Sequence, residues 1–231
     1  MDNSKGRMHE MKGQKDDPVK SAHQFFQTKQ VERTRKALER NGFDSLFVPD
    51  AKSAMKAVLD IIPDGATVGI GGSATLTQIG FFEGIKGRDV NLINPFSKGI
   101  TPEEAYELRR KIFLCDYFLC STNAITEEGQ LYNVDATGNR VGAMFFGPRK
   151  TIVVCGINKI VKDMEEARQR VWNMAAPTNA KRLGRKTPCT ETGVCSDCNS
   201  PERICNISVE MVKKPIRTDI SVLLVGEPLG I

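Results

Sequence analysis

Four of the seven cysteines in this 231-residue chain stand close together near its carboxyl end. Cys189, Cys195, Cys198 and Cys205 follow the spacing C-x5-C-x2-C-x6-C. A C-x2-C pair with one further thiol on either side can bring four thiolates to one centre without help from the rest of the fold. The spacing therefore predicts a metal centre held by these four cysteines.

The metal itself has two interpretations. The spacing is similar to the C-x6-C-x2-C-x5-C loop of the endonuclease III family, which holds a [4Fe-4S] cluster, and this is the cofactor we expect. The alternative is a structural zinc, although four-cysteine zinc sites more often use two C-x2-C pairs and only one is present here. Unliganded thiols are the third possibility. No helix-hairpin-helix segment stands in the sequence, so a role in DNA repair is not expected.

A glycine-rich stretch, GIGGSATLTQIG at 69–80, follows an apolar segment and precedes an amphipathic one. Gly71 and Gly72 allow a sharp turn, and the hydroxyls of Ser73 and Thr75 would lie beside free N–H groups at the start of a helix. The pattern favours a small anion, but it matches neither a dinucleotide fingerprint nor a Walker loop. The alternative is a tight turn from strand to helix in which Ser73 is only the helix cap.

A second polar stretch covers 121–148 and begins where another apolar segment ends. In open parallel sheets, ligands bind beyond the carboxyl ends of the strands, so its polar side chains are candidates for a ligand site. They are Ser121, Asn123, Glu127, Glu128, Asp135, Asn139 and Arg140. The alternative for each is a surface position in a long excursion. Both histidines, His9 and His23, lie near the amino end, so a Ser-His-Asp triad is not expected.

Short apolar segments alternate with amphipathic ones along most of the chain, which predicts an α/β fold with a mainly parallel sheet covered on both faces. Expected strands are 45–48, 67–70, 90–93, 115–120, 151–156 and 219–227, with a further edge strand at 211–215. Expected helices cover 18–41 and begin near Asp50, Ser73, Thr101 and Asp163. Cys115, Cys120 and Cys155 fall in apolar strands and are expected in the core.

The charge is concentrated at the amino end. Residues 1–40 carry ten Lys or Arg and six Asp or Glu, which leaves +1 of the total +5 for residues 41–231. This pattern is typical of a solvated arm, which we place at 1–20, and nucleic acid is not an expected partner. The first residues lack the apolar core of a signal peptide and no stretch approaches about 20 apolar residues, so we expect a cytoplasmic protein without membrane contact.

Four phrases, in order, resemble the LUD domain, the lactate-utilisation protein C family: GIGGSATLTQIG, STNAITEEGQLYNVDATGNRVGAMFFGP, VVCGINKIV and AAPTNAKRL. The resemblance covers roughly 20–231. It implies the three-layer α/β fold of ribose-5-phosphate isomerase and the CoA transferases, and a role in converting lactate to pyruvate beside iron-sulfur oxidoreductase partners. It does not imply a known reaction. The resemblance also implies a ligand site, formed by Gly71, Gly72, Ser73, Asn123, Asp135, Asn139, Arg140, Asn158 and Lys159.

These observations predict one domain at 21–231 with a cysteine-rich insertion at 186–206. The expected function is that of a subunit or accessory protein of cytoplasmic lactate oxidation, with a small-anion pocket and a metal centre for electron transfer or docking. Two alternatives remain open. One is an independent enzyme acting on a phosphosugar or an acyl-CoA, and the other is a regulatory module that senses redox state or a small ligand.

Overall fold

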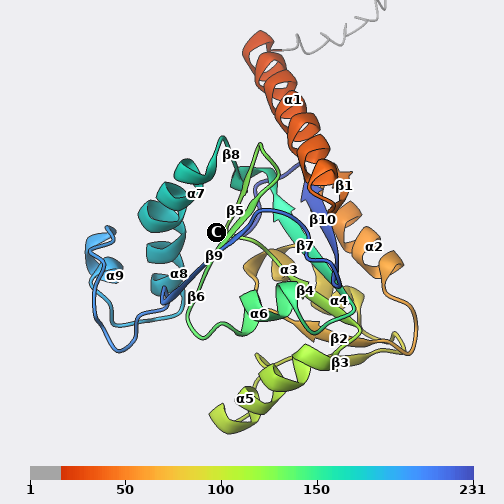
Figure 1. Cartoon of the computed structure of the whole chain (residues 1–231), viewed down its shortest axis with the longest axis vertical. Coiled ribbons are helices and arrows are strands. Elements are labelled where there is room, and N and C mark those ends of the chain that lie inside the picture. The colour runs from red at the N-terminus through yellow and green to blue at the C-terminus, as the bar shows by residue number, and fades with distance from the viewer. Residues whose placement is uncertain (1–16) are drawn as a thin grey trace, which may run out of the picture.

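A six-stranded parallel sheet forms the centre of the computed structural model, which describes residues 17–231. The strand order is β1-β10-β7-β4-β2-β3 (Figure 1). The strands are β1 (Asp44–Val48), β2 (Thr67–Ile70), β3 (Asn91–Ile93), β4 (Tyr117–Cys120), β7 (Lys150–Gly156) and β10 (Asp219–Val225). The strands predicted from the apolar segments are thus confirmed, and their ends differ from the predicted ends by no more than two residues.

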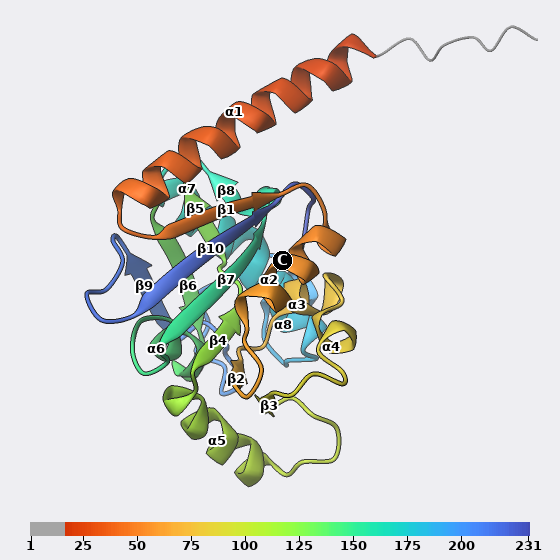
Figure 2. The same cartoon turned by 90° about the vertical axis from the view of Figure 1, so that its right-hand side faces the viewer.

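Helices cover both faces of this sheet, as predicted, in a three-layer arrangement (Figures 1 and 2). The α-helices are α1 (Pro18–Arg40), α2 (Ala51–Ile61), α3 (Ala74–Gln78), α4 (Phe81–Gly84), α5 (Pro102–Lys111), α6 (Asn139–Phe145), α7 (Met164–Arg170), α8 (Ala176–Arg182) and α9 (Cys189–Thr192). Two 3-10 turns, Ile112–Leu114 and Ile157–Lys159, and a π-helical turn, Val171–Ala175, complete the helical segments.

Side chains of the central strands alternate between two cores. Phe118 of β4 and Val153 of β7 face the core that contains α1 and α6, whereas Leu119 and Val154 face the core under α2, α3 and α4. All four are at most 1% exposed. Because both faces are buried, the strands read as continuous apolar runs in the sequence.

A second, four-stranded sheet lies against the first core, and the sequence analysis did not predict it. Its order is β8-β5-β6-β9, with β5 (Ala124–Thr126), β6 (Leu131–Asp135), β8 (Ile160–Val161) and β9 (Ile207–Met211). The stretch at 121–148 is therefore a buried hairpin followed by α6, and not a surface excursion. The prediction of an edge strand at 211–215 is wrong, because the strand of this region, β9, lies earlier and ends at Met211.

Local capping explains where several helices begin. The side chains of Asp50 and Asp163 each accept a backbone N–H of the following turn. Thr101 and Glu104 form a reciprocal capping box at the start of α5, which satisfies two backbone donors. Asp17 caps α1 at Pro18, so the last residues assigned to the amino-terminal arm are helical; residues 1–16 of that arm lie outside the described residues.

Only the second half of α1 packs on the body. Val31, Ala37 and Leu38 are buried, whereas Phe25 and Phe26 are more than half exposed. Figure 2 shows the first half of the helix running out beyond the sheet. No helix within residues 17–231 combines the length and the apolar character needed to cross a membrane.

Candidate functional site

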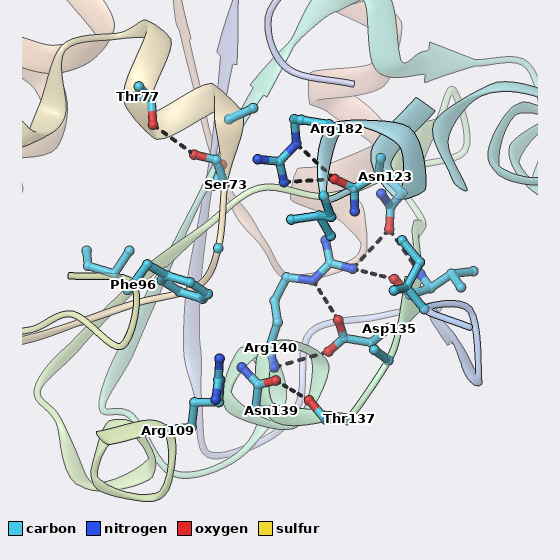
Figure 3. A pocket seen from close by; sticks show the side chains of 18 of the residues that line it. Ser73, Thr77, Phe96, Arg109, Asn123, Asp135, Thr137, Asn139, Arg140 and Arg182 are labelled. Carbon is cyan, nitrogen blue, oxygen red and sulfur yellow. Dashed lines mark hydrogen bonds and ion pairs between the residues drawn. The ribbon is translucent and has the colours of Figure 1, made fainter. Parts of the chain in front are cut away.

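A pocket of about 690 Å³ opens at the carboxyl ends of three neighbouring strands. The loops after β2, β3 and β4 supply Ser73, Phe96 and Asn123, and the end of β6 with the start of α6 supplies Asp135 and Arg140 (Figure 3). This is the edge at which open parallel sheets bind ligands. A pocket therefore lies at the strand ends where a ligand site was predicted.

Arg140 is held rigidly in the wall of this pocket. Its Nη2 donates to Asn123 Oδ1 at 3.0 Å and to the carbonyl of Val134 at 2.6 Å, and its Nε lies 3.6 Å from Asp135 Oδ1. The other carboxylate oxygen of Asp135 accepts the backbone N–H groups of Arg140 and Val141, at 3.1 and 3.2 Å. Asp135 thus both caps α6 and orients the guanidinium, so its carboxylate is engaged within the fold.

The pocket carries an excess of positive charge. Among residues 17–231, the pocket is lined by Arg109, Arg140, Arg182 and Arg185 and by one carboxylate, Asp135, so four positive charges less one negative leave +3. Arg109 lies over the ring of Phe96, 5.6 Å from the centroid, and Arg182 donates to Asn179. Guanidinium groups bind carboxylate and phosphate in two-pronged geometry, so this pocket is suited to an anion.

The glycine loop contributes in part. Gly72 and Ser73 line the pocket, and a Cβ on Gly72 would lie 2.9 Å from the Phe96 ring. Gly71 faces Phe118 and Cys120, and Thr75 is buried. Helix α3 has only five residues and Ser73 caps it. A helix this short supplies little dipole, so the positive charge of the pocket comes from the arginines.

Lys159 lies behind the glycine loop and outside the pocket. It is 3% exposed, and its Nζ donates to Thr75 Oγ1, Ser121 Oγ and the Thr122 carbonyl at 3.0–3.2 Å. Burial lowers the pKa of Lys159 to about 8, and the nearby Arg170 and Arg140 act in the same direction. No ion pair is formed by Lys159 within 17–231, so its charge is held by neutral acceptors.

Asn158 has a structural role next to this lysine. Its Oδ1 accepts the N–H of Leu229 at 3.0 Å, and its carbonyl accepts from Arg170 Nε at 3.3 Å. The bond from Leu229 fastens the segment after β10 beside the buried lysine, and the bond from Arg170 ties Asn158 to α7. Gly230 of that segment lies so close to Lys159 that an added Cβ would be 2.7 Å from Nζ.

The four clustered cysteines surround one small cavity of about 20 Å³, beside α8. All four are partly buried and free, whereas Cys115, Cys120 and Cys155 are buried in the core as predicted. Over residues 17–231, no three His, Cys, Asp or Glu side chains converge closely enough to hold one metal ion. The thiols therefore face a common space without meeting at a common point.

Comparison with known proteins decides the family. The LUD domain model matches residues 31–225. This chain belongs to the LUD domain family. The family is associated with lactate utilisation. No curated protein matches the sequence.

The fold is shared with a solved structure. A DUF162 family protein from Deinococcus radiodurans, determined by crystallography at 1.70 Å resolution, is similar with a TM-score of 0.52. The match covers 86% of this chain and 98% of the other at 14% sequence identity. At that identity the likeness supports the LUD-domain fold and says nothing of the ligand.

More residues were predicted for the ligand site, from the glycine-rich stretch and the LUD-domain resemblance, than line the pocket. Those that line it are Gly72, Ser73, Asn123, Asp135, Asn139 and Arg140. Gly71, Thr75, Asn158 and Lys159 lie outside its lining. Glu127, a candidate from the polar stretch, instead pairs with Arg33 at 2.8 Å and fastens α1.

Sequence reasoning missed three of the four arginines. Arg182 and Arg185 stand in the basic run AKRLGRK just before the cysteines, and this run was the available signal. Arg109 reaches the pocket from α5, and no local pattern distinguishes it from Arg110, which pairs with Glu107 on the surface.

Proposed function

We propose that this LUD-domain protein is a subunit or accessory protein of cytoplasmic oxidation of lactate to pyruvate, and that its pocket binds a small anion. The observation that carries the proposal is the net charge of +3 among the residues lining a strand-end pocket. The family's association with lactate utilisation supports a carboxylate such as lactate or pyruvate as the ligand. Iron-sulfur oxidoreductase subunits are the proposed partners, and the four-cysteine cluster would give the protein a metal centre for docking or electron transfer.

A direct binding measurement tests the anion site. Isothermal titration with lactate, pyruvate, inorganic phosphate, a phosphosugar and an acyl-CoA compares the candidate ligands on the same protein. Lactate or pyruvate binding supports the proposed role. Absence of binding by all five would refute an anion site in this pocket.

One observation favours a second candidate function. At about 690 Å³ the pocket exceeds what a three-carbon acid fills and falls within the range of larger ligands. An independent enzyme acting on a phosphosugar or an acyl-CoA would use this space. Preferential binding of the phosphosugar or acyl-CoA in the same titration would move the assignment to that function.

The partner proposal has its own experiment. A tagged copy recovered from lactate-grown cells should bring down an iron-sulfur or flavin oxidoreductase. The same copy recovered from cells grown without lactate controls for abundance. Recovery of the protein alone in both cases would contradict the accessory role and leave the anion site untouched.

Removing two pocket arginines should weaken anion binding. We expect Arg182→Gln combined with Arg185→Gln to lower the affinity for the bound anion at least about tenfold, because one charge-assisted hydrogen bond contributes about 1.5–3 kcal/mol. Arg149→Gln is the control. Arg149 is 87% exposed and lies just before β7, at the amino ends of the parallel strands and away from the pocket. Equal affinities in the two proteins would contradict the role of the pocket arginines.

Adding a side chain at Gly72 should lower anion affinity more than it lowers stability. In Gly72→Val the side chain is expected to push the Phe96 ring, which is 48% exposed, into the pocket mouth. Because an exposed ring can rotate away, stability should fall by only about 1 kcal/mol while anion affinity falls at least about tenfold. Calorimetric titration and urea unfolding of the same variant separate the two effects. Unchanged affinity would show that the ligand does not approach Gly72.

A further inference from the structure

We propose that Cys189, Cys195, Cys198 and Cys205 bind one thiolate-ligated metal centre, and that this centre fixes segment 186–206 beside the anion pocket, where Ile204 of the segment contributes to the lining. The inference rests on the proposed anion site for its second half. Its first half, the metal centre, stands on the cysteines themselves.

The donor set fits such a centre. The four thiols line a single cavity, with Ala176, Pro177 and Ala180 of α8 opposite them. Four thiolates are the ligands of both structural zinc and [4Fe-4S] clusters. On binding, four thiols release four protons to solvent, and either a zinc ion or a cluster core of charge 2+ leaves a complex of charge 2−. The four thiols line this cavity without converging at one point, so either kind of centre would require them to shift.

Apolar packing contributes little to the shape of segment 186–206. Its one sizeable aliphatic side chain before Ile204, Val194, is 64% exposed. Its ends are joined by polar contacts alone, with Lys186 N–H donating to Glu202 and Ser200 Oγ donating to the Lys186 carbonyl, both at 2.9 Å. Burial of apolar surface therefore contributes little to its order. Metal-thiolate bonds can supply that order, because binding at such sites is coupled to folding.

Arg203 holds the backbone of two of the four cysteines. Its Nη1 donates to the Cys198 carbonyl at 2.6 Å and its Nε to the Cys205 carbonyl at 3.2 Å. It also pairs with Asp197, the one residue other than glycine with positive φ among the described residues. A cation fixed next to two ligand residues offsets part of the negative charge of a thiolate centre, as outer residues of metal sites commonly do.

Three connections join this segment to the anion pocket. Ile204 lines both cavities. Asn206, next to Cys205, donates its N–H to the Asp135 carbonyl at 3.0 Å and its side-chain amide to the Ala136 carbonyl at 3.2 Å. Arg185 lines the pocket four residues before Cys189. A centre that orders the segment therefore also positions pocket residues on both of its sides.

The first test is metal content after anaerobic purification. About four irons and four sulfides per chain with absorption near ~400 nm identify the cluster, and one zinc without colour identifies zinc. Cys198→Ser should lose the metal in either case, whereas Cys115→Ser, a change at a core cysteine outside the group, should retain it. Absence of metal, with all four thiols alkylated in the native protein, would overturn the proposal.

The second test measures coupling. We expect removal of the metal by a chelator to weaken binding of lactate and inorganic phosphate about tenfold and to open 186–206 to protease. By linkage, saturating anion should strengthen metal retention by the same factor. Metal present with unchanged anion affinity would refute the coupling between the segment and the pocket and keep the metal centre. Metal present with no anion bound in either state would instead refute the anion site, so the two failures are distinguishable.

Discussion

Replacing Lys159 with methionine is expected to give a stability difference from the wild type that changes with pH by about 3 kcal/mol. The pKa of Lys159 is about 8 in the folded protein and 10.5 in the reference state. Between these values the unfolded chain binds more protons, so wild-type stability rises with pH from about 8 to about 10.5. At about pH 7 the folded protein bears the full cost of a buried ammonium, and the shift of 2.5 corresponds to about 3 kcal/mol.

Urea unfolding of both proteins between about pH 7 and pH 10.5 measures this difference. Lys159→Met also loses the hydrogen bonds from Nζ to Thr75, Ser121 and Thr122, which lowers its stability by an amount that does not depend on pH over this range. The same substitution at exposed Lys56 controls for the loss of a lysine. A difference between wild type and Lys159→Met that stays flat with pH would mean that the lysine keeps its ordinary proton affinity inside the fold.

Gly129→Ala should be among the most damaging single changes, with a loss of about 3–5 kcal/mol. Gly129 turns the β5–β6 hairpin with φ +77, and an added Cβ would lie 2.5 Å from the backbone nitrogen of Leu38 and 2.7 Å from the carbonyl oxygen of Ala37. Backbone atoms of α1 cannot rotate away as a side chain can. The variant therefore incurs both left-handed strain and the separation of the hairpin from α1.

Gly65→Ala measures the left-handed backbone strain without a close contact. Gly65 has φ +78, nearly the same conformation, but no atom lies within 4 Å of an added Cβ. Its loss should be about 1–2 kcal/mol, from strain alone. Urea unfolding of both variants gives the contact contribution as the difference. Equal losses would show that the hairpin and α1 do not depend on close approach at this point.

Features that depend on local chemistry were predictable from the sequence. The caps at Asp50 and Asp163 and the capping box at Thr101 each involve residues three apart, so the sequence contains the whole interaction. The strands of the central sheet are continuous apolar runs because both of their faces are buried. Their positions and the parallel arrangement follow from that pattern.

Features that depend on distant residues were not predictable in this way. The small sheet pairs β6 with β9, which lie more than 70 residues apart, and no turn signal connects them. The pocket arginines come from α5, α6, the end of α8 and the loop after it, and only the folded chain brings them together. The burial of Lys159 was not predictable, since it depends on Thr75, Ser121 and the segment after β10.

The place of β10 in the central sheet has a consequence for how the protein is made. This strand is the last of the described strands in chain order, yet it lies inside the sheet between β1 and β7. During synthesis β1 lacks its sheet neighbour until residues 219–225 have left the ribosome, because β10 is the one strand that pairs with it in the described part of the chain. Non-local pairings of this kind slow folding and leave strand edges exposed. A nascent chain of about 200 residues should therefore be a substrate for chaperones, and release from them should coincide with the emergence of β10.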